Sequence, residues 1–278
     1  MTGRDDATGA GSGSGTLSIV GIGPGLPDHL TRKARSTIAN ADAVYAAPTY
    51  QSFLAQDDGL PLDSEAAGPE IVDSNREDLP ALARETFDRV RSGEHVVHVS
   101  GGDPNVYGKS DLLFALAEEE GATDLDVEVV PGVTAALGGA AMLGAPLSND
   151  FCTVSLSDKW RDWAAIEEKL RAATEAGFVL AIYNGWHDLD RAVAVIRDGR
   201  ADDAPIAILE DVGRGDAGRN PGGESATIST LGSVAGDVDE IGTPGMMAIV
   251  GTADTRVLHT DHGPYLVTPR GELDVTRL

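Results

Sequence analysis

The sequence predicts an α/β fold made of two α/β domains with a cleft between them. Its 278 residues exceed the commonest size of a single domain, about 100–150 residues, so one large α/β unit or two smaller domains that share a cleft are both permitted, and two are preferred. Short apolar runs alternate with segments of helical period, and this alternation is typical of a mostly parallel sheet with right-handed crossovers. Three of the runs end in glycine-rich turns, and open α/β sheets bind ligands outside the carboxyl ends of their strands.

The first half of the chain shows the alternation most clearly. Apolar runs predict strands, and helical periodicity predicts helices, at the following residues: strands 17–21, 43–46, 95–100 and 127–130, and helices 31–41, 79–92 and 110–120. Thr31 has a side chain that suits the N-cap of the first helix. Residues 57–69 are rich in Asp, Gly and Pro, so they predict a polar loop.

In the second half of the chain, predicted strands and helices alternate less regularly. The predicted elements are strands at residues 153–157, 178–183, 206–209, 226–230 and 246–250, and helices at residues 163–176 and 189–199. Several of these strands follow one another without a helix between them, which favours a mixed sheet. Residues beyond 256 show no period, and no element is predicted there.

These elements set the expected domain boundaries. Residues 1–15 consist mainly of Gly, Ser, Ala and Asp, which cannot bury a core, so a disordered leader is expected. The N-terminal α/β domain is expected over residues 16–145. The C-terminal α/β domain with the mixed sheet is expected over residues 146–258, followed by a tail at residues 259–278.

The charge of the chain excludes some classes of partner. Asp and Glu number 45 against 21 Lys and Arg, which gives a net charge of -24. A field this negative repels nucleic acid and anionic membranes, so neither is expected as a partner. The acidic residues are spread along the whole chain, which indicates a halophilic host; an acidic mesophilic protein is the alternative.

Targeting and metal signals are sparse. No stretch approaches the roughly 20 apolar residues of a membrane span, and the start lacks the basic and apolar regions of a signal peptide, so a cytoplasmic protein is expected. The single cysteine, Cys152, excludes an internal disulfide. His259 and His262 are spaced like a metal pair but have no third ligand in sequence, so no metal site is expected.

The chemistry is expected at the glycine-rich turns. They read Gly-Ile-Gly-Pro-Gly at residues 21–25, Ser-Gly-Gly-Asp-Pro at residues 100–104 and Pro-Gly-Val-Thr-Ala at residues 131–135. The first turn is not a dinucleotide fingerprint, because Leu26 holds the last glycine position, and no Lys-Ser/Thr pair makes it a phosphate loop. One such turn is as easily structural as functional, but three at strand ends favour a ligand site.

In this order, the three turns resemble the tetrapyrrole (corrin/porphyrin) methylase family, and the resemblance covers residues 17–256. It implies the class III S-adenosylmethionine (SAM) methyltransferase fold, a folded SAM cofactor and a homodimer. Further segments, at residues 149–151, 156–158, 163–170 and 181–184, are similar to the ring-contracting carbon 17 enzymes. The resemblance therefore implies methylation of carbon 17 of a precorrin-3B or cobalt-factor III type tetrapyrrole in cobalamin biosynthesis.

The resemblance also implies site residues. The cofactor contacts carried over are Pro24, Gly101, Gly102, Asp103, Val106, Thr134, Ala135, Tyr183, Asn184, Val212, Gly245 and Met246. Asp103 is also a candidate polar anchor, with a helix cap as its structural alternative, and His29 is a candidate for the proton transfers of ring contraction. Lys109 and Arg161 are candidates to meet substrate carboxylates.

One departure leaves the substrate open. Residues 185–188 read Gly-Trp-His-Asp where the carbon 17 enzymes usually carry a proline and a basic run. Methylation of a neighbouring corrin carbon or of uroporphyrinogen is the first alternative, and a diphthamide-forming relative is another. A cofactor-binding paralogue without catalysis is an alternative of a different class.

Overall fold

The computed structural model describes residues 15–60, 62, 68–75, 77–186, 188–215, 218, 223–237 and 245–271. They form two compact units, one of residues 15–23 and 27–132 and the other of residues 24–26 and 133–271. Residues 1–14 of the expected leader lie outside the described residues. Gly15, the last residue expected in the leader, is buried, and its N–H donates to the Val90 carbonyl oxygen at 3.2 Å.

The first unit is a five-stranded parallel sheet with the strand order β3-β2-β4-β1-β5. Its strands are β1 (Thr16–Gly21), β2 (Ala43–Ala46), β3 (Glu70–Asp73), β4 (His95–Ser100) and β5 (Asp126–Val130). Its helices are α1 (Arg32–Ala39), α2 (Pro48–Leu54), α3 (Leu79–Arg91) and α4 (Ser110–Glu119), with a short 3-10 turn, η1, at Pro27–His29. Parallel neighbours bring the carboxyl ends of β1, β4 and β5 to one edge of the sheet.

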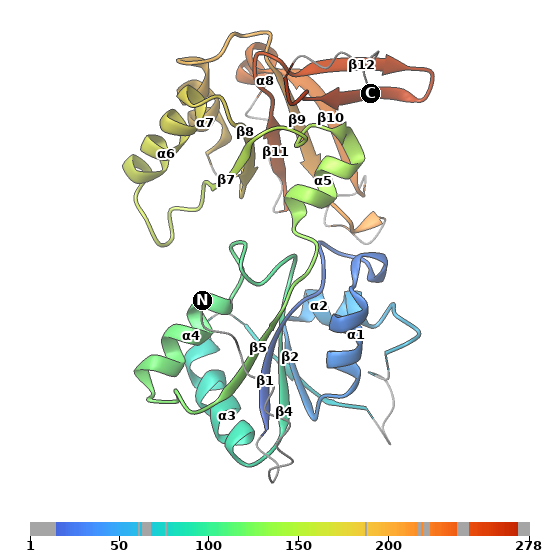
Figure 1. Cartoon of the computed structure of the whole chain (residues 1–278), viewed down its shortest axis with the longest axis vertical. Helices are drawn as coiled ribbons and strands as arrows, with labels where there is room; N and C mark the ends of the chain where they lie inside the picture. The colour runs from blue at the N-terminus through green and yellow to red at the C-terminus, as the bar shows by residue number, and fades with distance from the viewer. Residues whose placement is uncertain are drawn as a thin grey trace. The chain divides into compact units, whose positions relative to one another are not determined.

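Both faces of this sheet are covered (Figure 1). Leu17 and Ile19 of β1 pack with the cluster under α3 and α4, whereas Val20 packs with the cluster under α1 and α2. This alternation follows the two-residue period of a strand. The central strands β1, β2 and β4 are buried along nearly their whole length and are mostly apolar, which explains why they are visible in the sequence.

The second unit contains a mixed five-stranded sheet in the order β10-β9-β11-β8-β7, in which only β7 and β8 run parallel. Its strands are β7 (Phe151–Ser155), β8 (Val179–Tyr183), β9 (Pro205–Glu210), β10 (Ser225–Thr230) and β11 (Met247–Val250). Its helices are α5 (Ala135–Leu143), α6 (Trp163–Glu175), α7 (Leu189–Arg197) and α8 (Leu231–Asp237). A smaller sheet joins β12 (Arg256–Thr260), β13 (Gly263–Val267) and β6 (Gly144–Ala145).

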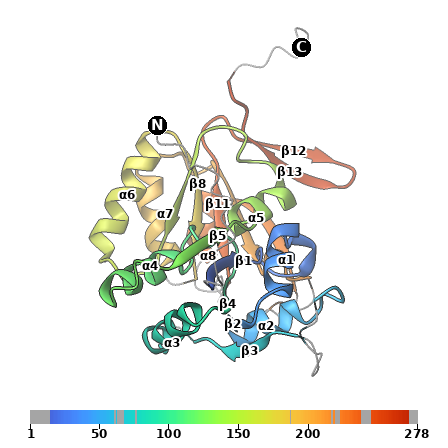
Figure 2. The same cartoon turned by 60° about the horizontal axis from the view of Figure 1, so that its bottom comes forward.

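Helices lie on both faces of the mixed sheet as well. Side chains of α6, α7 and α8 belong to one core cluster, and side chains of α5 belong to another, together with Leu266 of β13. Figure 2 shows the β12–β13 hairpin as a ribbon of its own beside the end of α5. The two units thus confirm the predicted α/β class, with a parallel sheet in the first and a mixed sheet in the second.

Most predicted elements are present, and Thr31 is the N-cap of α1, accepting from the Ala34 N–H at 3.1 Å. The strand predicted at residues 153–157 is wrong by two residues, since β7 is Phe151–Ser155. The sequence also failed to predict α2, β3, α5 and α8. The tail, in which the sequence predicts no element, contains the β12–β13 hairpin, so the boundary expected after residue 258 falls inside β12. The other boundary is expected after residue 145, whereas the second unit already begins at Val133.

A buried polar group lies beneath the carboxyl end of β4. His98 is fully buried, its ring stacks on Tyr45 at 4.7 Å between centroids, and its Nε2 lies 2.8 Å from the Thr86 hydroxyl. Its Nδ1 has no hydrogen-bond partner among the described residues. Burial, with a smaller contribution from the charge of Lys109, lowers the pKa of His98 from 6.5 to about 3.

This pKa predicts a dependence of stability on pH. Between pH 6.5 and about 3 the unfolded chain binds a proton at His98 that the folded chain does not, so stability falls as the pH falls. We expect the free energy of unfolding of the wild type to drop, relative to His98→Gln, by about 1.4 kcal/mol per pH unit below pH 6. Urea titrations from pH 8 to pH 5 measure this difference. His95→Gln, at the exposed start of the same strand, is the control, and parallel curves for the wild type and His98→Gln would contradict the expectation.

Candidate functional site

The three glycine-rich turns meet at one edge of the parallel sheet in the first unit. Gly23 and Gly102 form an isolated antiparallel bridge, in which the Gly23 N–H donates to the Gly102 oxygen at 3.2 Å and the Gly102 N–H donates to the Gly23 oxygen at 2.7 Å. The third turn joins them through Gly132, whose N–H donates to Asp103 Oδ2 at 3.0 Å. Segments from the ends of β1, β4 and β5 are thus tied to one another, the first two by backbone hydrogen bonds and the third through the Asp103 carboxylate.

Glycine is required at this meeting point because the backbones approach too closely for a side chain. A Cβ on Gly21 would lie 2.6 Å from the Gly102 oxygen and 2.8 Å from the Gly132 nitrogen. A Cβ on Gly132 would collide with the Gly102 oxygen as well. Gly23 and Gly102 also have φ angles of 79° and 66°, which L side chains rarely adopt. The turns therefore present peptide groups, not side chains, at this edge.

Asp103 fixes the shape of the second turn. Its Oδ1 accepts from the Asn105 N–H at 2.8 Å, and its Oδ2 accepts from the Gly132 N–H. It is not the cap of the following helix, because α4 begins at Ser110 and its N-cap residue is Lys109. The carboxylate therefore links the second and third turns through two backbone donors. Such hydrogen bonds to an ionised acceptor are about twice as strong as neutral ones.

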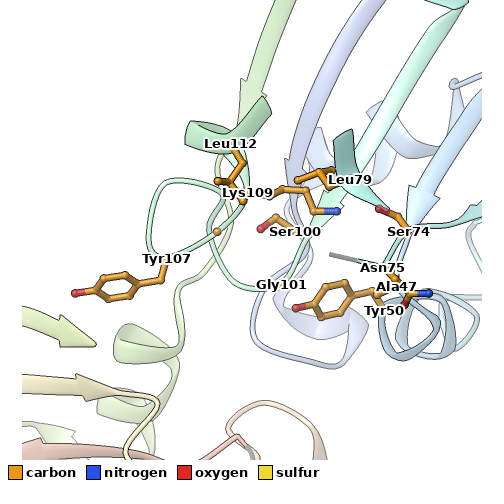
Figure 3. Close-up of a pocket in the computed structure, with 11 residues that line it drawn as sticks. Ala47, Tyr50, Ser74, Asn75, Leu79, Ser100, Gly101, Tyr107, Lys109 and Leu112 are labelled. Carbon is orange, nitrogen blue, oxygen red and sulfur yellow. The ribbon is translucent and has the colours of Figure 1, made fainter. Parts of the chain in front are cut away.

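A cavity of about 290 Å³ opens beside the second turn, at the carboxyl ends of β2, β3 and β4 (Figure 3). Its polar lining comes from Tyr50, Ser74, Asn75, Ser100 and Lys109. In Figure 3 the ammonium group of Lys109 points toward Ser74, whereas the side chain of Tyr107 points away from Lys109 and Ser74.

The composition of this cavity favours a negatively charged guest. Lys109 is the one side chain in its described lining that carries a charge at neutral pH, and the lining holds no carboxylate. Ser74 and Ser100 are 4% and 3% exposed, so they add polar groups to a largely buried part of the cavity wall. Sequence reasoning missed Tyr50, Ser74 and Asn75, because β3 and α2, which place them, carry too weak a pattern to be predicted.

In the second unit, Tyr183 organises the start of α5. Its hydroxyl lies 2.5 Å from Thr134 Oγ1 and accepts from the Ala136 N–H at 2.9 Å. Thr134 is the N-cap residue of α5 but makes no capping bond with its own side chain. The Tyr183 hydroxyl therefore takes the place of the missing cap, and β8 fixes the position of the turn that contains Thr134 and Ala135.

Asn184 follows at the end of β8 in a left-handed conformation, with φ 56°. Its side-chain amide donates to Ser155 Oγ at 2.8 Å, which joins the carboxyl ends of β7 and β8. Arg161 donates to the Ser155 carbonyl oxygen at 2.8 Å from the loop that follows β7. The predicted residues Tyr183, Asn184 and Arg161 thus belong to one hydrogen-bonded edge of the second unit's sheet.

The other predicted residues lie in two places. Pro24, Val212, Gly245 and Met246 all belong to the second unit, where Val212 is 4% and Met246 2% exposed. Val106 is half-buried just after the second turn, in the first unit. His29 is half-buried in η1, packs its Cβ against Gly23, and has a buried Nδ1 without a hydrogen-bond partner among the described residues.

Other classes of site find no support in the described part of the chain. There, no group of three or more His, Cys, Asp or Glu side chains is placed to hold a metal ion, and His259 and His262 lie on or beside the β12–β13 hairpin. None of the described helices is both long and apolar enough to cross a membrane. Cys152 is half-buried on β7, and burial raises the pKa of its thiol.

Comparisons with known proteins agree with this geometry. Residues 16–218 match the family model of the Tetrapyrrole (Corrin/Porphyrin) Methylases. The chain is similar to the precorrin-3B C(17)-methyltransferase of Sinorhizobium sp, with 34% identity over 92% of this chain and 97% of that one. It is also 28% identical to the probable cobalt-factor III C(17)-methyltransferase of Salmonella typhimurium, over 92% of this chain and 98% of that one.

The similarity extends to three dimensions. The crystal structure of the methyltransferase CobJ superimposes with a TM-score of 0.77 at 27% identity, covering 92% of this chain and all of that one. The cobalt precorrin-4 methyltransferase CbiF, at 24% identity and a TM-score of 0.67, shares the fold. The chain belongs to the tetrapyrrole (corrin/porphyrin) methylase family of S-adenosylmethionine-dependent methyltransferases.

Proposed function

We propose that this protein transfers the methyl group of SAM to carbon 17 of a precorrin-3B or cobalt-factor III type tetrapyrrole, with contraction of the ring, in cobalamin biosynthesis. The observation that carries the proposal is the meeting of three backbone turns at the ends of β1, β4 and β5, in a chain similar over almost its whole length to a precorrin-3B C(17)-methyltransferase. A cofactor-binding module without catalysis needs no pocket for an anionic substrate. This chain has a cavity lined by Lys109, whose charge is complementary to such a substrate.

The residues present fit SAM. The turns expose peptide groups without side chains, which suits a ligand that carries both a carboxylate and an ammonium group. In the first unit, Gly101, Gly102, Asp103 and Val106 are proposed to contact the cofactor. In the second unit, the proposed contacts are Pro24, Thr134, Ala135, Tyr183, Asn184, Val212, Gly245 and Met246.

For methyl transfer, the main task of the protein is to place the cofactor and the reacting carbon of the substrate. When bound, SAM supplies a methyl group that is already activated by the sulfonium. The chain's own residues hold the cofactor through rigid backbone turns and exclude water from the reacting carbon, and alignment of this kind contributes much of a methyl transfer's rate. His29, with its unpartnered Nδ1, is proposed to serve the proton transfers that ring contraction requires.

Lys109 is proposed to hold the substrate by a carboxylate. Tetrapyrrole precursors carry acetate and propionate side chains, and a cavity with one ammonium, several hydroxyls and no carboxylate in its described lining matches such a group. In a chain with a net charge of -24, a local positive site is needed to offset the long-range repulsion of an anionic substrate.

Three expectations about setting accompany this proposal and stay predictions. The spread of acidic residues indicates a halophilic host, the family implies a homodimer, and a cytoplasmic location is the third expectation. Sedimentation of the purified protein in molar salt tests the homodimer.

The proposal is tested by incubating the protein in molar salt with SAM and either precorrin-3B or cobalt-factor III. We expect a product that is heavier by one methyl group and that has the absorption spectrum of a contracted ring, measured by mass spectrometry and visible spectroscopy. Methyl transfer without contraction would assign a neighbouring carbon instead. Cofactor binding without methyl transfer to either substrate would favour the non-catalytic alternative.

Asp103→Asn tests the turns as the cofactor site. The variant keeps one oxygen acceptor but presents an amide NH₂ group to one of the two backbone donors, so the link between the second and third turns is broken. We expect the dissociation constant for SAM to rise roughly tenfold, because the second and third turns, which are proposed to hold SAM, are then no longer tied together. Calorimetric titration measures it, with Asp126→Asn at the exposed start of β5 as the control. Unchanged binding would show that the turns do not hold the cofactor.

Lys109→Gln tests the cavity as a carboxylate site. Removal of the ammonium group is expected to raise the KM for the tetrapyrrole about tenfold, while the dissociation constant for SAM stays within twofold. Lys109→Arg, which retains the charge, is expected to recover most of the loss. Lys169→Gln on the exposed face of α6 is the matched control, and an equal effect of both Gln variants would mean that only the overall charge matters.

A further inference from the structure

A buried ion pair lies just beyond β9 in the second unit. Arg214 Nη1 lies 3.1 Å from Asp211 Oδ1, and the two side chains are 15% and 1% exposed. Asp211 also has a left-handed backbone, with φ 48°, and its carbonyl oxygen accepts from the Arg214 N–H at 2.9 Å. The ion pair thus closes a tight turn at residues 211–214, to which we refer as the 211–214 turn.

The 211–214 turn is joined to the first glycine loop. The Gly213 carbonyl oxygen accepts from the Leu26 N–H at 2.6 Å, and Arg214 Nε makes a long hydrogen bond of 3.5 Å to the Pro24 oxygen. A Cβ on Gly25 would collide with Gly213. Residues 24–26 are therefore fixed by backbone contacts with this turn and belong to the same compact unit.

The same side chains reach a third segment. A Cβ on Gly245 would lie 3.2 Å from Arg214 Nη1 and 3.4 Å from Asp211 Oδ1, so the peptide next to Met246 packs directly on the ion pair. Val212, inside the turn, packs against Gly138 and Gly139 of α5. The ion pair thus lies where three separate stretches of backbone come together.

We propose that Asp211 and Arg214 are positioning residues for the cofactor: their ion pair sets the relative placement of the Pro24, Val212 and Gly245–Met246 segments, and thereby the affinity for SAM. This inference rests on the proposed function, because these segments are the ones proposed to contact the cofactor in the second unit. Neither side chain needs to touch the cofactor for this role. Arg214 acts through the Pro24 carbonyl, and Asp211 holds Arg214 in place.

A role in stability alone is the competing explanation, and charge chemistry separates the two. Breaking a buried pair by removing one partner strands a charge and destabilises the fold, whereas removing both charges together is often neutral. If the pair serves stability alone, the variant without both charges is therefore expected to match the wild type in stability and in affinity for SAM. If the pair positions the cofactor segments, the same variant still lacks the donor that reaches Pro24. It then binds SAM weakly even though its stability equals that of the wild type.

The experiment compares Arg214→Lys with the double variant Asp211→Asn/Arg214→Met. Lys keeps the charge beside Asp211 but lacks the several N–H groups of a guanidinium, and Asn tolerates the left-handed backbone at position 211. The melting temperature and the dissociation constants for SAM and S-adenosylhomocysteine are measured for each variant. Arg197→Met is the control, because its pair with Asp202 lies in the same unit but is exposed, at 37% and 65%.

Both variants are expected to melt within a few degrees of the wild type and to bind SAM about tenfold more weakly, with kcat at saturating SAM unchanged. Binding equal to that of the wild type in either variant would overturn the inference. Arg197→Met is expected to leave affinity unchanged, and weaker binding in it would show that loss of any surface charge has this effect. Failure of the wild type itself to bind SAM would instead refute the proposed function.

Discussion

The close approach of backbones at Gly21, Gly102 and Gly132 is the constraint on which the rest of the first unit depends. The strands β1, β4 and β5 end together because their pairing is parallel and in register, and the turns that follow can touch only where no Cβ intervenes. Asp103 then locks two of the turns through backbone N–H groups. The result is a rigid edge of peptide groups, which suits a ligand recognised by hydrogen bonds to the main chain.

The second unit reaches a similar end by different means. Side chains contribute more to its loops: the Tyr183 hydroxyl caps α5, Asn184 joins the ends of β7 and β8, and Arg214, paired with Asp211, reaches the Pro24 oxygen beside the backbone contacts of the first glycine loop. Each of these groups is satisfied by protein atoms. Mutations here are thus expected to act through the position of neighbouring backbone.

Buried polar chemistry and charge are distributed unevenly. His98 lies on β4, two residues before Ser100 of the cavity, and burial keeps it uncharged at neutral pH. Among the described residues that line the cavity, Lys109 is the one that carries a charge at neutral pH. In a chain this acidic, carboxylates dominate the surface and repel an anionic group of a substrate. A pocket with an ammonium group attracts such a group instead.

The α/β class, most of the elements and the three turns could be predicted from the amino-acid sequence, because the central parallel strands are buried and mostly apolar and glycine turns interrupt them visibly. Only the tertiary structure revealed α5, whose Ala-Ala-Leu-Gly-Gly stretch has no polar face, and the β12–β13 hairpin, whose mostly exposed strands carry no apolar period. It also decided which side chains do what: Asp103 as a link between turns, Tyr183 as a cap and Arg214 as a tie to Pro24. Those roles depend on contacts between residues up to 190 positions apart, and no local pattern encodes them.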